Sequence, residues 1–316
     1  MLLAFLLLSL GACSPQVTKK PINKLRVEAL NSFEVLPESI IDTNKNKDLI
    51  ALGKKLYFEK KLSVNNSISC NSCHQLDNAG VDNLPTSPGH EGKLGGRNSP
   101  TVYNAGLHFA QFWDGRAENL EAQAVGPILN PVEMGMPNAE AVVAKLSAEK
   151  EYLELFKKAF SDGSITYPRV GESIAAFEKT LLTPSRFDDF LRGDDYALTD
   201  KEKKGLFTFM DKGCIACHNG PAIGGNSFQK LGDSIEYETK DIGRMEVTKD
   251  PADLKYFKVP SLRNITKTFP YFHDGSIKTI EEAIRLMGKH QLGLTLTKEE
   301  IESIKSFFIS LNAKKY

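Results

Sequence analysis

The pattern Cys-x-x-Cys-His occurs twice in this chain, at residues 70–74 and 214–218. In each copy, two thiols can bond to the vinyl groups of one haem, while the next residue presents an imidazole to its iron. Redox dithiols and zinc sites also use paired cysteines. A dithiol needs no following histidine, and a four-cysteine zinc site would have to join pairs roughly 140 residues apart. The sequence therefore predicts two covalently bound haems c. The residues that hold them are Cys70, Cys73, Cys214 and Cys217, with His74 and His218 as axial ligands.

The first residues predict export. An apolar run at residues 2–10 is too short to span a bilayer and is followed by Gly-Ala-Cys. This arrangement is typical of a lipoprotein signal peptide, so we expect removal of residues 1–12 and lipidation of Cys13. A plain signal peptide and an uncleaved helix are the alternatives, because no Lys or Arg precedes the run. Since c-type haem attachment occurs outside the cytoplasm, we expect a periplasmic protein with a polar tether at residues 13–24. Its only expected membrane attachment is the lipid.

Segments of the second half repeat segments of the first. Residues 100–104 (Pro-Thr-Val-Tyr-Asn) match residues 260–264 (Pro-Ser-Leu-Arg-Asn), and residues 112–115 (Phe-Trp-Asp-Gly) match residues 272–275 (Phe-His-Asp-Gly). A helical pattern follows in both halves. This self-similarity predicts an internal duplication of one haem domain. Equivalent positions hold unlike residues, Trp113 and His273.

Helical periodicity dominates and few segments alternate as strands do. We therefore expect an all-α fold of two cytochrome-c-like haem domains with little strand and with long loops at residues 77–100 and 219–260. A length of 316 residues suffices for two cores. We place the first domain at residues 25–183 and the second at residues 184–316. Lys and Arg balance Asp and Glu at 40 each, so nothing indicates a nucleic-acid partner.

The group that occupies the iron's axial position opposite the histidine distinguishes an electron-transfer haem from a catalytic haem. For the second haem, Met287 lies on an amphipathic helical pattern, where a core methionine is an equal alternative. Competing ligands are Met210, Met245 and His290. For the first haem, His90 lies in a polar Gly-rich loop, where an exposed histidine is the commoner case. Glu133 lies in a loop among apolar residues, and a carboxylate there could move a proton between the oxygens of a peroxide.

Motifs along the chain resemble those of the bacterial dihaem cytochrome c peroxidase family, from about residue 30 to the end. Besides the two haem-attachment segments they are Gly80-Val81-Asp82, Thr86-Ser87-Pro88-Gly89-His90, Arg97-Asn98-Ser99-Pro100-Thr101, Gln111-Phe112-Trp113-Asp114-Gly115-Arg116-Ala117, Asn130-Pro131-Val132-Glu133-Met134, Val259-Pro260-Ser261-Leu262-Arg263-Asn264 and Pro270-Tyr271-Phe272-His273-Asp274-Gly275.

For the first haem, the resemblance implies the low-potential, peroxidatic site. His74 is then its proximal ligand, His90 a removable distal ligand and Glu133 the acid–base residue. Gln123 and Phe112 are their pocket neighbours. The loop that follows His90, residues 91–96, departs from the aromatic-containing loop of many relatives, which leaves the on–off behaviour of His90 open.

For the second haem, the resemblance implies a high-potential electron-transfer site with His218 and Met287 as axial ligands. His273 then lies near this haem, and Trp113 lies on the electron route between the haems. The resemblance also implies one calcium ion between the domains, bound by Asn98 and by the backbone carbonyls of Thr268 and Pro270. Oxygen ligands without a cage of carboxylates fit a calcium that keeps several waters.

The resemblance thus implies an enzyme that reduces hydrogen peroxide to water. Its electrons come from a small redox protein, a cytochrome c or a cupredoxin, and relatives are commonly homodimers. One alternative is a dihaem oxidase that modifies a protein partner, as in relatives that place a tyrosine at the high-potential iron. A second is a non-catalytic dihaem electron carrier. A His/Met spectrum for the second haem argues against the oxidase, and a peroxide-reactive haem argues against the carrier.

Overall fold

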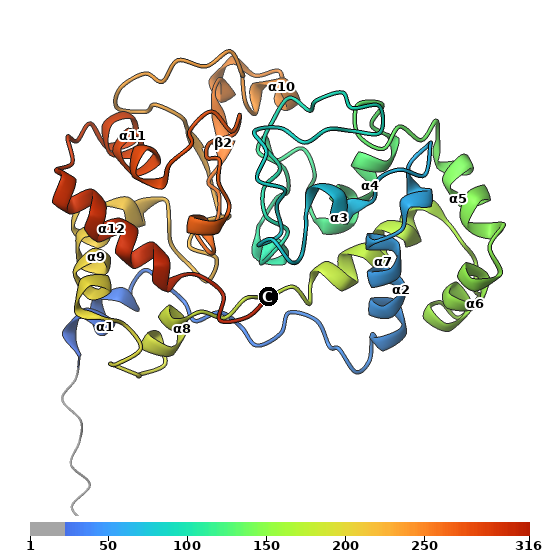
Figure 1. Cartoon of the computed structure of the whole chain (residues 1–316), viewed down its shortest axis with the longest axis horizontal. Coiled ribbons are helices and arrows are strands. Elements are labelled where there is room, and N and C mark those ends of the chain that lie inside the picture. Colours follow the sequence, from blue (N-terminus) through green and yellow to red (C-terminus); the bar gives the residue numbers. More distant parts are fainter. Residues whose placement is uncertain (1–22) are drawn as a thin grey trace, which may run out of the picture.

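The computed structural model describes residues 23–316 and shows a mostly helical chain arranged as two lobes (Figure 1). The predicted signal peptide, Cys13 and most of the expected tether lie outside the described residues. The named strands of the described part form one antiparallel ribbon, in which β1 (Phe228–Lys230) pairs with β2 (Tyr256–Lys258). The prediction of a mostly helical fold with little strand is confirmed. No helix within residues 23–316 is long and apolar enough to cross a membrane.

The first lobe is built on α7, against which α2 and α4 pack. A Cβ at Gly53 of α2 would lie 1.7 Å from the carbonyl oxygen of Ser173 on α7, so only glycine permits this helix–helix approach. The core of this lobe includes Leu52, Leu56 and Ile174, none of which is exposed. The helices of the lobe are α2 (Lys47–Tyr57), α3 (Cys70–Cys73), α4 (Leu120–Leu129), α5 (Ala139–Ser147), α6 (Lys150–Ala159) and α7 (Tyr167–Glu178).

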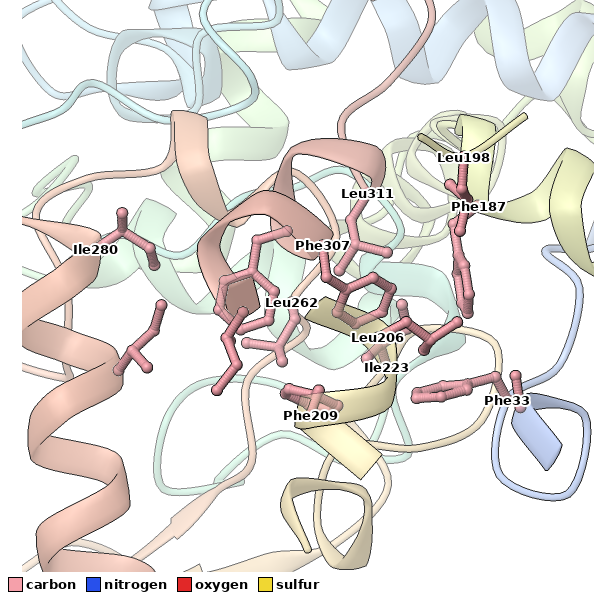
Figure 2. Close-up of a cluster of buried hydrophobic side chains, with 14 of the residues drawn as sticks. Phe33, Phe187, Leu198, Leu206, Phe209, Ile223, Leu262, Ile280, Phe307 and Leu311 are labelled. Carbon is pink, nitrogen blue, oxygen red and sulfur yellow. The ribbon is translucent and has the colours of Figure 1, made fainter. Parts of the chain in front are cut away.

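The second lobe repeats this arrangement with α9 against α12. A Cβ at Gly205 of α9 would lie 1.9 Å from the carbonyl oxygen of Ser303 on α12. An aromatic cluster that contains Phe209 and Phe307 fills the core between these helices (Figure 2). The helices of the lobe are α1 (Lys24–Ala29), α8 (Arg186–Leu191), α9 (Asp200–Asp211), α10 (Met245–Thr248), α11 (Ile280–Leu292) and α12 (Lys298–Ser310).

The N-terminal segment packs with the second lobe. We assigned residues 25–183 to the first domain, but residues 24–36 pack into the core of the second lobe. Phe33 makes an edge-to-face contact with Phe187 at 5.3 Å between ring centroids. The ring gains burial and aromatic contacts with Phe187, Phe209 and Phe307 in this core. Asn23 caps α1 and donates a hydrogen bond to Asp195, so the expected tether does not extend through residue 24.

The segments that repeat in the sequence have matching local geometry. Asn104 and Asn264 are both left-handed, with φ of 62° and 64°. Phe112 and Phe272 share the same unusual conformation, with φ of 67° and 71°. The side-chain amides of Asn104 and Asn264 both donate to the hydroxyl oxygen of Thr183, at 2.7 and 3.0 Å. This hydroxyl therefore joins the two repeated segments where the lobes meet.

Candidate haem-binding sites

The first cysteine pair lies on α3, a single helical turn. Ser69 and Ser72 form a capping box at its start, so the turn is stabilised although it spans only Cys70–Cys73. Residues three apart lie on one face of a helix, which directs both thiols to the same side. Burial raises the pKa of the Cys73 thiol to about 11 and raises that of Cys70 further. Both thiols are free of disulfides, as thioether attachment requires.

His74 directly follows this helical turn, and its ring is oriented by the backbone. Its Nδ1 lies 3.0 Å from the carbonyl oxygen of Pro100, and the hydroxyl of Tyr57 donates to the His74 carbonyl at 2.5 Å. Burial lowers the pKa of His74, which favours the neutral imidazole. A neutral ring that donates from Nδ1 to a carbonyl leaves the Nε2 lone pair free, the usual tautomer of a histidine that binds a metal.

The second cysteine pair has the same design. Cys214 begins a short 3-10 turn after Gly213, whose φ is 83°. His218 follows, with its Nδ1 3.4 Å from the carbonyl oxygen of Ile223. Burial lowers the pKa of His218 to about 4, so this ring is also neutral with Nε2 available. The two predicted proximal histidines are thus held in the same tautomer by backbone carbonyls.

An apolar cavity brings the predicted second-haem residues together. Cys214, Cys217, His218 and Met287 all line it. The cavity thus offers two thiols, an imidazole and a thioether to one group, which is the donor set that a haem c with His/Met ligation needs. Of the methionines and histidines weighed from the sequence, Met210, Met245 and His290 are absent from the described lining. His290 Nδ1 instead lies 2.9 Å from the carbonyl oxygen of Ile235.

Trp113 connects this cavity with the neighbourhood of His74. Its indole lines the cavity and donates from Nε1 to the carbonyl of Asn98 at 2.9 Å. Pro100, whose carbonyl orients His74, lines the same cavity. Trp113 therefore lines the cavity of His218 and bonds to Asn98, two residues before the Pro100 that orients His74.

His273, at the position equivalent to Trp113, also lines the cavity and is only 3% exposed. Its ring stacks on Phe257 at 4.5 Å, and its Nε2 lies 3.1 Å from the hydroxyl of Thr239. Burial lowers its pKa, although Asp274 and Asp241 oppose this shift. A neutral, stacked histidine thus lines the same cavity as His218.

His90 and Glu133 lie on two loops that pack against each other. The His90 amide donates to the Glu133 carbonyl at 2.8 Å, and His90 Nε2 lies 3.3 Å from the carbonyl oxygen of Pro131. A Cβ at Gly135 would lie 2.3 Å from His90 Nε2, so the ring rests on this glycine. The two residues expected to face the first iron are therefore brought together.

Glu133 is a half-buried carboxylate with an arginine nearby. Burial raises its pKa, while Arg116 and a hydrogen bond from Asn130 at 2.9 Å oppose the shift. The Arg116 guanidinium stacks over the Phe112 ring at 3.5 Å. Arg116 was not among the predicted site residues, although it lies within the motif of residues 111–117. The sequence around an arginine in a loop does not indicate which carboxylate its side chain faces.

Phe112 lies close to α4, the helix that carries Gln123. A Cβ at Gly126 would lie 3.6 Å from Phe112 Cζ, and Gln123 lies one turn earlier on the same helix. Phe112 lines the cavity that also contains Trp113. Phe112 therefore lies between the cavity and the helix of Gln123, while Gln123 itself is absent from the described lining.

The three predicted calcium ligands lie around one space. Asn98, Thr268 and Pro270 all line the cavity. The Asn98 amide donates to the carbonyls of Leu84 and Pro85 at 3.0 and 3.3 Å, so its Oδ1 is the atom left for a cation. Residues 23–316 contain no cluster of three or more His, Cys, Asp or Glu side chains suited to a metal. Carbonyl and amide oxygens are the donors that this region offers.

Comparison with known proteins assigns the family. A protein-family model described as di-haem cytochrome c peroxidase matches residues 47–196. Cytochrome c551 peroxidase of Nitrosomonas europaea is 48% identical over 85% of this chain and 81% of its own length. The protein of the same name from Pseudomonas aeruginosa is 42% identical over 92% of this chain and 87% of its own length. The chain belongs to the di-haem cytochrome c peroxidase family.

Solved structures agree with membership of the di-haem cytochrome c peroxidase family. The crystal structure of a MauG-like protein associated with microbial copper homeostasis superimposes with a TM-score of 0.77. It is 27% identical, and the match covers 89% of this chain and 94% of that protein. The diheme peroxidase BthA from Burkholderia thailandensis, 20% identical, has a TM-score of 0.72 over 85% of this chain and 86% of its own, and shares the fold. Two thiol pairs and two oriented imidazoles are what a family of dihaem enzymes needs.

Proposed function

We propose that this protein reduces hydrogen peroxide to water, with two electrons supplied by a small redox protein such as a cytochrome c or a cupredoxin. The observation that carries the proposal is the pair of Cys-x-x-Cys-His sites, each with its histidine held as a neutral, Nδ1-donating ring. When bound, the haems supply redox chemistry and an iron that binds peroxide. The relatives named cytochrome c551 peroxidase, at 42–48% identity, support the assignment.

The two sites differ in the groups beside them, and this supports a division of roles. The His218 cavity contains the Met287 thioether, which closes an iron to other ligands and raises its reduction potential. The loop of Glu133 instead brings a carboxylate to the first lobe. We assign electron storage to the His218/Met287 site and peroxide chemistry to the His74 site. The matched helix contacts at Gly53 and Gly205 support an origin of both lobes by duplication.

Glu133 moves the proton in this proposal. Its carboxylate accepts a proton from one oxygen of peroxide and delivers it to the other, which favours unequal cleavage of the O–O bond. Burial raises the pKa of Glu133, and the nearby Arg116 cation limits this increase. Gln123 and Phe112 orient and enclose the substrate, while Trp113 provides an aromatic side chain between the two sites.

Three further assignments belong to the same proposal. Asn98 Oδ1 and the carbonyls of Thr268 and Pro270 bind one calcium ion, supported by their place around one space. The protein acts in the periplasm, anchored through a lipid on Cys13, as its N-terminal sequence suggests. It functions as a homodimer, as is common in relatives of this family.

The substitution Glu133→Gln tests the catalytic assignment. It keeps the size of the side chain and removes the acid–base group. The expected result is two haems per chain with unchanged spectra, and a loss of peroxide turnover of about 10²–10⁴-fold. A matched control is Glu140→Gln, an exposed residue in the first turn of α5, which is expected to leave turnover unchanged. Wild-type turnover in Glu133→Gln would remove the proton-transfer role.

A further inference from the structure

Lys258 is a buried lysine without an acidic partner. It ends β2 and is only 6% exposed. The ion pairs of residues 23–316 do not include it. Its ammonium instead lies 3.0 Å from Nδ1 of His108. Burial of a charge costs free energy unless the charge is paired. An anion beside the Lys258 ammonium would pair with it, and the described side chains do not supply one.

His108 adds a donor without an acceptor at the same place. Because its Nδ1 accepts from Lys258, its Nε2 carries the ring proton, and this buried atom has no hydrogen-bond partner among the described residues. The ring is fixed against Gly225, where a Cβ would lie 2.3 Å from the ring carbon Cδ2. The pair therefore presents an ammonium without an anionic partner and an N–H group without an acceptor.

Both donors line the cavity that contains Cys214, Cys217 and His218. The chemistry that satisfies an ammonium and a neighbouring N–H is an anionic oxygen acceptor, and a carboxylate is the simplest one. Haem carries two carboxylates on its propionate side chains. The described cavity lining includes both cysteines of the second site but neither Cys70 nor Cys73.

We propose that Lys258 and His108 form the binding site for a propionate carboxylate of the haem attached at Cys214 and Cys217. The inference rests on the proposed function only for the presence of that haem. Burial lowers the pKa of Lys258 to about 7 in the protein alone, with Asp114 opposing the shift. Asp114 is itself bonded to Arg97 and Arg116, so it is not available to neutralise Lys258 directly.

The site has a consequence for electron storage. The Lys258 amide donates to the Trp113 carbonyl at 2.7 Å, so the ammonium is carried by a strand attached to the backbone of the inter-haem tryptophan. Reduction removes one positive charge from the iron, and a fixed cation nearby favours that change. Lys258 is thus a positioning and tuning residue that raises the reduction potential of the His218 haem relative to a site without the cation.

The test is a spectroelectrochemical titration of the full-length, haem-loaded protein. In Lys258→Met, the equilibrium constant for reduction of the His218 haem is expected to fall about tenfold, which corresponds to about 59 mV for a one-electron couple. The His74 haem is expected to shift by less than about threefold. Lys278→Met is the matched control, because Lys278 also lies in the second lobe but is exposed and is absent from the described lining of the cavity. It is expected to leave both constants unchanged.

If Lys258→Met binds fewer than two haems, Lys258→Gln replaces it, since glutamine keeps a donor and removes the charge. The same direction of shift is expected. An unchanged constant for the His218 haem in a fully loaded variant would overturn the proposal, as would a shift confined to the His74 haem. A wild-type protein that holds two haems but does not consume peroxide would contradict the proposed function and leave this measurement of potential valid.

Discussion

His90 Nε2 lies 3.3 Å from the carbonyl oxygen of Pro131, two residues before Glu133. The atom that an iron ligand would use is therefore within hydrogen-bond distance of the loop that carries the proposed proton-transfer carboxylate. Gly135 forms the surface on which the ring rests. The position of His90 therefore depends on the Glu133 loop. We expect a substitution in one loop to change the conformation of the other.

Gly135→Ala tests this link. Gly135 has φ of 69°, and a Cβ there would lie 2.3 Å from His90 Nε2. The substitution is expected to displace His90 from Pro131 and to increase the low-spin fraction of the oxidised His74 haem, measured by electron paramagnetic resonance. Gly92→Ala is the control, because Gly92 also has positive φ, 76°, but no neighbour within 4 Å of the added carbon. Equal spectra in both variants would refute the proposed resting place of His90.

Arg116 should set the acid limb of the pH–rate profile. Burial raises the pKa of Glu133 and Arg116 opposes that shift. Turnover requires the ionised carboxylate, so it should increase as pH rises through this pKa. Arg116→Leu removes the opposing cation and should move the limb of kcat/KM to higher pH, whereas Arg116→Lys should move it less. A limb that stays in place in Arg116→Leu would show that another group controls it.

The close approach of two helices in each lobe predicts a similar loss of folding stability from two matched substitutions. Gly53→Ala and Gly205→Ala each place a Cβ less than about 2 Å from a carbonyl oxygen of the facing helix. Each is expected to lower the free energy of unfolding by at least about 3 kcal/mol or to prevent folding. Gly126→Ala, whose added carbon meets its nearest neighbour at 3.6 Å, should change it by less than about 1 kcal/mol. Urea denaturation at equal haem content measures all three.

A buried ion pair should be the most sensitive polar contact of the second lobe. Asp188 and Arg263 are both fully buried and lie 2.8 Å apart. Asp188 also accepts from the Leu36 amide at 2.9 Å, which fixes the N-terminal segment. Asp188→Ala is expected to cost about 3–5 kcal/mol because it leaves Arg263 buried and unpaired. Lys204→Ala, which breaks an exposed pair with Glu299, should cost less than about 1 kcal/mol.

The sequence predicted the attachment sites because thiols and imidazole are fixed by local spacing. It left Met287 evenly balanced between an iron ligand and a core methionine, with Met210, Met245 and His290 as competitors. Only the tertiary fold shows which of them lines the cavity of His218. The packing of Phe33 in the core of the second lobe could not be read from the sequence, because an isolated aromatic residue does not indicate which core it joins. Lys258 and His108 received no role, because lysine is usually exposed and their contact joins residues far apart in the chain.

The central claim is that the His218/Met287 site stores an electron and the His74 site reacts with peroxide. A reductive titration with peroxide added at the one-electron stage tests it most directly. We predict two haems per chain, reduction of a His/Met haem first, and consumption of peroxide with two electrons for each molecule reduced. Two closed haems that are reduced without consuming peroxide, at either the one- or the two-electron stage, would contradict the account and identify an electron carrier.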